Sequence, residues 1–148
     1  MDHERWMRQA LALADEAAAA GEVPVGCVIV REGRIVGRGR NRREEERSAL
    51  AHAEMDAIRE ACAALGDWRL TDCGLYVTLE PCPMCAGAIL NARLKWLCFG
   101  ARDPKTGSCG SVLNLFEENY GYRPAIYGGI LEAECLERMQ AFFRGLRS

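Results

Sequence analysis

The order of strand-like and helix-like segments constrains the fold of this chain more than any other feature. Residues 25–31 and 34–40 have strand character and are joined by a tight turn, which predicts a hairpin. Beyond it the two patterns alternate: we expect helices at 52–65, 82–92 and 130–144, and strands at 73–79, 94–99 and 124–127. Strands that alternate with helices pair in parallel, with helices on both sheet faces. The sequence therefore predicts an α/β fold, a three-layer α/β/α sandwich around a mixed sheet of about five strands.

The segments outside this alternation are one further helix and the connecting loops. Apolar side chains recur at spacings of three and four over residues 2–20, which predicts an amphipathic helix before the hairpin. We expect polar or glycine-rich loops at 41–50 and 100–111, and a short helix at 112–119.

Composition indicates a folded chain and excludes two classes of protein. Of the 148 residues, 49% are apolar and 27% are charged, so disorder is not the dominant state. The longest apolar runs, 17–20 and 25–30, are far shorter than the roughly 20 residues of a membrane-spanning helix. The first residues include several acids and do not resemble a signal peptide. We expect a single domain over residues 1–148, a cytoplasmic location and no membrane partner.

The distribution of basic residues is uneven. The net charge of −2 argues against a generic nucleic-acid coat protein, whose domains are strongly basic. Yet seventeen of the nineteen basic residues are arginine, and seven of these fall between Arg31 and Arg47. Two interpretations stay open at this point: a solvated hairpin, or a patch that faces phosphates, which suit guanidinium groups.

Two short motifs carry the chemistry when they are taken together. His52-Ala53-Glu54 opens a predicted helix, and Pro81-Cys82-Pro83-Met84-Cys85 lies between a strand and the next helix. Cys82 and Cys85 are three residues apart, so both sulfurs point to one side, and the start of a helix favours thiolates. Two thiolates and the His52 imidazole make three ligands, which leaves the fourth position of a tetrahedral zinc ion open for water. The pattern predicts one catalytic zinc ion per subunit.

Glu54 is better suited to moving protons than to binding the metal. It lies two residues from His52, so the two side chains do not share a face of an ideal helix. A carboxylate beside a metal-activated water is a good general acid and base. Cys82 and Cys85 have two other interpretations, a redox dithiol or half of a four-cysteine structural site. The first leaves His52 idle, and the second requires another close cysteine pair, which the sequence lacks.

The remaining six cysteines are not read as a disulfide framework, because the sequence shows no secretory signal. Cys27, Cys62, Cys98 and Cys135 lie in apolar contexts and are expected to be small buried hydrophobes. No role is assigned to the other two.

The two motifs together resemble the signature of the zinc-dependent nucleoside and nucleobase deaminases, a cytidine-deaminase-like family. More narrowly, the chain resembles bacterial tRNA-specific adenosine deaminases, which convert the wobble adenosine of an anticodon to inosine. The supporting stretches are EVPVG at 22–26, GRGRNR at 37–42, LYVTLEPCPMCAGAI at 75–89 and FGARDPKTG at 99–107. The resemblance implies that His52, Cys82 and Cys85 hold zinc, and that Glu54 moves protons while water adds to C6 of the adenine.

The resemblance also implies contacts with the substrate. Asn41 is expected to hydrogen-bond the flipped base, Val25 to pack on it, and Ala53 to offer its backbone N–H. Farther out, Asp103 would lie near the nucleotide backbone. Phe143 and Arg144 would meet the anticodon stem-loop of the tRNA partner. The family is homodimeric, so a homodimer is expected here.

The chain departs from its relatives in one loop, and two other functions stay open. Gly121-Tyr122-Arg123 stands where many relatives carry Asn-His-Arg, in a loop expected near the substrate entrance. The first alternative function is a deaminase of free bases or nucleosides, such as guanine or cytosine. Asn41, the ARDPKTG stretch and the Phe-Phe-Arg near the end argue against it. The second is a catalytically silent RNA-binding subunit, against which the intact Glu54 argues.

Overall fold

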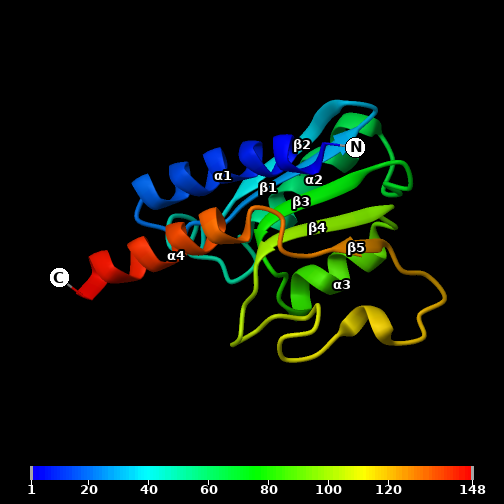
Figure 1. Cartoon of the computed structure of the whole chain (residues 1–148). Coiled ribbons are helices and arrows are strands. Elements are labelled where there is room, and N and C mark those ends of the chain that lie inside the picture. The colour runs from blue at the N-terminus through cyan, green and yellow to red at the C-terminus, as the bar shows by residue number, and fades with distance from the viewer. Residues whose placement is uncertain (1, 148) are drawn as a thin grey trace.

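The core of the molecule is a five-stranded mixed sheet in the order β2-β1-β3-β4-β5. A computed structural model describes residues 2–147, and the side chains of residues 2–146. The strands are β1 (Gly26–Arg31), β2 (Arg34–Arg40), β3 (Gly74–Leu79), β4 (Trp96–Ala101) and β5 (Ala125–Tyr127). β1 pairs antiparallel with both β2 and β3, whereas β3, β4 and β5 run parallel to one another. The predicted α/β class and the mixed five-stranded sheet are confirmed (Figure 1).

Helices cover both faces of this sheet, as the alternating pattern predicts. α1 (His3–Ala19) and α4 (Glu132–Arg147) lie on one face, and α2 (Ala53–Leu65) and α3 (Pro83–Asn91) lie on the other (Figure 1). Successive residues of β1 point alternately to the two layers. Cys27 and Ile29 join the core under α2 and α3, whereas Val28 joins the core under α1 and α4. Among the described residues, no helix is both long and apolar enough to span a membrane.

The predicted element boundaries are close, with two corrections. The strand expected at 94–99 runs from Trp96 to Ala101, because Trp96 is the residue that pairs with Gly74 at the start of β3. The short helix expected at 112–119 is wrong in length: only the 3-10 turn η1 (Leu115–Glu117) forms. The N–H of Gly110 donates to the Leu113 carbonyl at 2.9 Å, so the chain before η1 makes a tight turn instead of a helix.

One edge of the sheet gathers segments that are distant in sequence. Because β1 runs opposite to its neighbours, its amino end meets the carboxyl ends of β2, β3 and β4. The loops 41–52 and 101–111 leave from this edge, and α2 and α3 begin there. In Figure 1 both loops lie with α4 at the left end of the sheet. Open α/β sheets bind ligands outside the carboxyl ends of their strands, so this edge is where a functional site is expected.

Candidate active site

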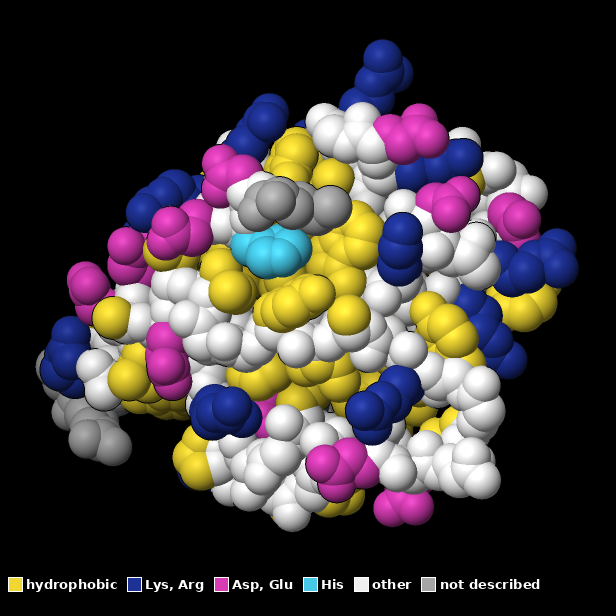
Figure 2. Space-filling model, turned by 45° about the vertical axis from the view of Figure 1, so that its right-hand side comes forward, with side chains coloured by type: hydrophobic (Ala, Val, Ile, Leu, Met, Phe, Trp, Pro, Cys, Tyr) yellow, Lys and Arg dark blue, Asp and Glu magenta, His cyan; other side chains and the backbone are white. Residues whose placement is uncertain are grey.

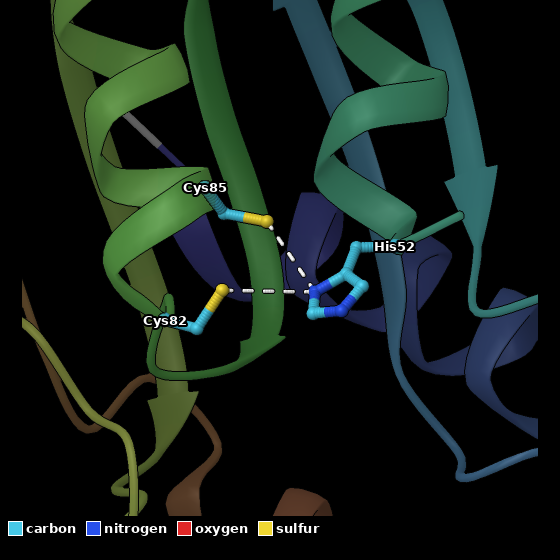
Figure 3. Close-up of side chains that lie close together, drawn as sticks. All are labelled: His52, Cys82 and Cys85. Atoms are coloured by element: carbon cyan, nitrogen blue, oxygen red, sulfur yellow. Dashed lines mark hydrogen bonds between the residues drawn. The ribbon is translucent and has the colours of Figure 1, made fainter. Parts of the chain in front are cut away.

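Three side chains that can bind a metal meet at the starts of α2 and α3. His52 immediately precedes α2, Cys82 immediately precedes α3, and Cys85 lies in the first turn of α3. The His52 Nδ1 atom lies 3.7 Å from Cys82 Sγ and 3.5 Å from Cys85 Sγ. Figure 3 shows both sulfurs pointing toward the imidazole ring. Within the described chain this is the one group of three or more such residues whose ligand atoms lie within 4.8 Å of one another.

These distances fit a tetrahedral metal centre. Metal–sulfur bonds of about 2.3 Å and a metal–nitrogen bond of about 2.0 Å at tetrahedral angles place nitrogen and sulfur ligands about 3.5–3.6 Å apart. The two observed N–S distances, 3.5 and 3.7 Å, bracket this separation. The site is therefore shaped for a metal ion that His52, Cys82 and Cys85 would hold.

Packing of α2 against the sheet holds His52 in place. A Cβ atom on Gly39 of β2 would lie 2.0 Å from the carbonyl oxygen of Ala53 and 2.9 Å from the amide nitrogen of Ala57. The first turn of α2 therefore rests directly on the backbone of β2, where no side chain fits. This close approach sets the position of His52, which immediately precedes the helix.

Hydrogen bonding between the two cysteine side chains moves their pKa values in opposite directions. The hydrogen bond from Cys85 lowers the pKa of Cys82 to about 4, against the opposing effect of burial. The same hydrogen bond, together with burial, raises the pKa of Cys85 well above its usual range. The hydrogen bond to Cys82 also raises the pKa of His52. The lowered pKa of Cys82 favours its thiolate, the form that binds metals.

Glu54 lies beside this group but outside the set of three ligands. Its side chain is only 4% exposed, and burial raises its pKa to about 7, assisted by the nearby Cys82 thiolate. A carboxyl group with a pKa near neutrality can both accept and donate a proton at the working pH. The arrangement has the parts of an acid–base catalyst next to a metal site.

These groups open onto a cleft of about 820 Å³. Its lining includes nine of the ten candidate residues: Val25, Asn41, His52, Ala53, Glu54, Cys82, Asp103, Phe143 and Arg144. The tenth, Cys85, is fully buried behind His52 and Cys82. The structure thus brings together residues from four loops, the first turn of α2, and α4, although their individual roles toward a substrate stay predictions.

Asn41 is held in a fixed orientation at the cleft wall. It is 6% exposed, and its side-chain amide donates to the Val23 carbonyl at 3.3 Å. Its Oδ1 accepts the N–H of Arg43 at 3.2 Å, which forms an Asx turn. The amide retains a second N–H and a second lone pair for another partner.

Sequence reasoning missed Glu80, which fixes the opposite wall of the cleft. This buried carboxylate accepts the N–H of Asp103 at 3.0 Å, of Cys109 at 2.9 Å and of Ser111 at 3.1 Å, and it also binds the Ser111 hydroxyl. Burial opposes its ionisation, yet these hydrogen bonds lower the pKa of Glu80. A Cβ on Gly107 would lie 2.4 Å from its carboxyl carbon, so the loop closes tightly around it. A carboxylate directly before Pro-Cys, at the end of an apolar strand, is the signal that could have identified it.

The loop at Tyr122 lies elsewhere than expected. The Tyr122 hydroxyl donates to the carbonyl of Leu94 and, at 3.0 Å, to that of Arg93. Both carbonyls precede β4, at the end of that strand remote from Asp103. The expectation that this loop borders the substrate entrance is therefore wrong for the cleft of this chain: the phenol is anchored beside the opposite edge of the sheet.

Comparison with known proteins places the chain among deaminases. The sequence model of the MafB19-like deaminases matches residues 1–147. The chain is 50% identical over 145 residues to the tRNA-specific adenosine deaminase of Bacillus subtilis (strain 168), which covers 97% of this chain and 90% of that protein. A solved structure from a study of A-to-I editing by tRNA:A34 deaminases superposes with a TM-score of 0.87 and 44% identity. The superposition covers 90% of this chain and 98% of the chain in that structure.

A second structural neighbour is more distant in sequence. The guanine deaminase of Bacillus subtilis superposes with a TM-score of 0.67 and 36% identity, covering 97% of this chain and 95% of its own. It shares the fold, but its sequence identity is lower than that of both tRNA-deaminase relatives, and its TM-score is lower than that of the tRNA:A34 deaminase structure.

Proposed function

Because the chain belongs to the MafB19-like deaminase family and, within it, to the tRNA-specific adenosine deaminases, we propose that it converts the wobble adenosine of a tRNA anticodon loop to inosine. The single observation that carries this proposal is the cleft in which the His52, Cys82 and Cys85 group meets a buried Glu54. A scaffold without catalytic function has no need to bury a carboxyl group beside metal ligands.

We propose zinc as the metal, held by His52, Cys82 and Cys85. Two thiolates and one imidazole are a ligand set that zinc accepts in catalytic sites. A zinc ion bound there supplies a Lewis acid that lowers the pKa of water toward 7. Two thiolates also balance the charge of the ion, so the site is neutral and suits an uncharged heteroaromatic ring.

The reaction is hydrolysis: adenosine and water give inosine and ammonia. The water oxygen forms a bond to C6 of the adenine, and the bond from C6 to the exocyclic nitrogen breaks. Glu54 would accept one proton of the attacking water and deliver it to N1. It would then take the second proton from the hydroxyl now on C6 and pass it to the amino group, so that ammonia leaves and C6 becomes a carbonyl. Its position at the cleft wall, two residues after the His52 ligand, supports these transfers.

The base enters the cleft between Asn41 and Val25. A wobble nucleotide in an anticodon loop is already unpaired, so extruding it is less costly than from a duplex. An Asn side chain offers one donor and one acceptor and can pair with a purine edge. Asp103, Phe143 and Arg144 then face the RNA on either side of the cleft mouth.

We infer that the chain acts as a homodimer in the cytoplasm. Val112 and Leu113 are 57% and 44% exposed. The Ser108 N–H donates to the Pro81 carbonyl at 2.9 Å, which holds the loop that carries both beside the start of α3. Exposed apolar groups of this kind favour association with a second surface. Light scattering tests the dimer directly, with a monomer as the opposing result.

The proposed function is tested by letting substrates compete and identifying each product by its mass. We expect the zinc-loaded protein to form inosine in an anticodon stem-loop with adenosine at the wobble position, and to leave cytidine in the same loop intact. Guanine is included as a further competing substrate, because a guanine deaminase shares this fold. Binding energy from the rest of the RNA is needed to hold the base, so free adenosine should react slowly. Faster conversion of guanine or any free base would instead favour a nucleobase deaminase.

A further inference from the structure

The basic residues near the cleft fall into two groups, those with an acidic partner and those without. Arg40 and Arg42, in the arginine-rich segment, both bind Glu45, at 3.1 and 3.0 Å. Arg42 also contacts Asp56 of α2 at 3.5 Å. Each of the two arginines therefore already has a carboxylate partner, and ion pairs of this kind also hold the side chains down against the protein surface.

The basic residues that line the cleft have no such partner. Arg43, Arg102, Lys105 and Arg144 form no ion pair with any residue whose side chain is described, and all four are exposed. Arg102 instead lies over the Phe99 ring at 5.3 Å. By contrast, on the face of the molecule that Figure 2 shows, basic and acidic side chains are interspersed around a hydrophobic middle. The cleft is thus lined by four basic side chains that have no acidic partner among the described residues.

The acidic residues of the cleft do not neutralise this charge. Glu54 is buried, and Glu80 is enclosed by hydrogen bonds from its own loop. Asp103 uses both of its oxygens within its turn. Oδ1 accepts the N–H of Lys105 at 3.0 Å, and Oδ2 accepts the hydroxyl of Thr106 at 2.8 Å. These hydrogen bonds leave the Asp103 carboxylate charged, but the four basic side chains that line the cleft outnumber its three acidic ones.

Arg43 and Lys105 occupy equivalent positions on opposite walls. Each follows by two residues a side chain that closes an Asx turn: Asn41 Oδ1 accepts the N–H of Arg43 at 3.2 Å, and Asp103 Oδ1 accepts that of Lys105 at 3.0 Å. Arg43 follows β2 and Lys105 follows β4, with β1 and β3 between them. Three strand spacings of about 4.8 Å put the two turns about 14 Å apart, with the base-binding cleft between them.

We propose that Arg43 and Lys105 form a two-sided clamp for the phosphodiester groups on either side of the nucleotide in the cleft. This inference rests on the proposed function and deepens it, because it assigns the ligand class of both walls: single-stranded RNA backbone, not a free base or nucleoside. Long cationic side chains on rigid turns reach outward to the RNA backbone while the base points into the cleft. Arg42, which precedes Arg43 in sequence, takes no part because Glu45 and Asp56 already bind it.

The test is the salt dependence of RNA binding. All proteins carry Glu54→Gln, so that a bound anticodon stem-loop is not turned over. Each phosphate contact on a single strand contributes about −0.7 to the slope of log K against log salt. We expect Arg43→Gln and Lys105→Gln each to reduce the steepness of this slope by about 0.7, and the double variant by about 1.4. Arg42→Gln is the matched control and should leave the slope unchanged.

A chemically modified RNA tests the same contacts from the other side. Uncharged methylphosphonate linkages replace the phosphate on the 5′ or the 3′ side of the wobble nucleotide. One of these substitutions should abolish the effect of Arg43→Gln, and the other that of Lys105→Gln. In proteins that retain Glu54, both variants should raise KM and leave kcat within about twofold of wild type. The reason is that they lose contacts which stabilise the bound substrate and the transition state equally.

The outcomes distinguish a failure of the clamp from a failure of the proposed deaminase function on which it rests. If the wild-type protein forms no inosine in the stem-loop, the proposed function fails. If neither Arg43→Gln nor Lys105→Gln changes the slope, or if Arg42→Gln changes it as much as they do, the clamp is wrong whether or not inosine forms. Folding of each variant is checked by its thermal midpoint, which substitution of the exposed and unpaired Arg43 and Lys105 side chains should leave unaltered.

Discussion

Replacing Glu80 by glutamine should weaken the cleft wall without altering its shape. The carboxylate accepts three backbone N–H groups and binds the Ser111 hydroxyl. The best placement of a glutamine keeps its oxygen on the N–H groups of Cys109 and Ser111 and turns its NH2 toward Ser111 Oγ and the Asp103 N–H. The N–H of Asp103 then faces another donor. A buried donor without a partner costs about 1–3 kcal/mol, and each bond that loses its charge assistance weakens by about 1 kcal/mol. Together these losses come to about 3–5 kcal/mol.

This loss should appear in both stability and substrate binding. We expect urea unfolding of the zinc-loaded Glu80→Gln protein to show a free energy of unfolding lower by about 3–5 kcal/mol, with an unchanged slope against urea. Because the orphaned N–H belongs to Asp103, KM for the stem-loop should rise more than kcat falls. Glu80→Asp, which restores the charge on a shorter side chain, should recover part of the KM. The control is Glu22→Gln: Glu22 accepts the N–H groups of Glu44 and Glu45 and supports the other wall.

Two results would refute this reasoning. A Glu80→Gln protein within about 1 kcal/mol of wild type would mean that the network does not stabilise the loop. A free energy of unfolding lowered by the predicted amount, with unchanged KM and kcat, would mean that the position of the loop has no effect on substrate binding or turnover.

Three further predictions concern the metal group and the base. Cys85→Ala should bring zinc in elemental analysis close to zero and lower the thermal midpoint, because two ligands hold the ion less tightly; full zinc content would point to a different ligand set. Glu54→Ala should keep zinc and RNA binding while kcat falls by roughly 10²–10⁴, the usual contribution of a general acid–base group; a rate within about tenfold of wild type would remove Glu54 from the mechanism. Asn41→Ala should depress inosine formation in the stem-loop with zinc intact; equal conversion of the adenosine loop would show that Asn41 does not select the base.

The sequence predicted the sheet well because β1, β3 and β4 are short, mostly apolar runs, and such runs are recognisable locally. Strand ends were less predictable, since they depend on partners distant in the chain. Leu94 belongs to the same apolar run as Trp96, yet β4 begins at Trp96, where pairing with Gly74 starts. At the other end the Glu80 N–H donates to the carbonyl of Ala101 at 2.8 Å and extends the pairing beyond the apolar run.

The metal ligands were predictable for the same reason that the strands were. Cys82 and Cys85 lie within one turn of a single helix, so their spacing alone brings the sulfurs together. Glu80 differs, because a glutamate at the end of a strand is usually exposed. Only the tertiary structure shows that the loop 101–111 folds back over it. The place of Glu80 before Pro-Cys marks the residue in the sequence, but its hydrogen bonds to the loop that carries Asp103 depend on the tertiary structure.

Arg42 and Arg43 show most clearly what local sequence leaves undetermined. The two are adjacent, chemically identical and part of one arginine-rich segment, so a count of charges treats them alike. In the fold Arg42 reaches Asp56, which comes from the first turn of α2, whereas Arg43 turns into the cleft. A guanidinium that already has two carboxylate partners gains little from a phosphate, because it must give up those contacts to bind it. An unpaired guanidinium pays no such penalty, and for this reason the contribution to RNA binding should differ between two neighbouring arginines.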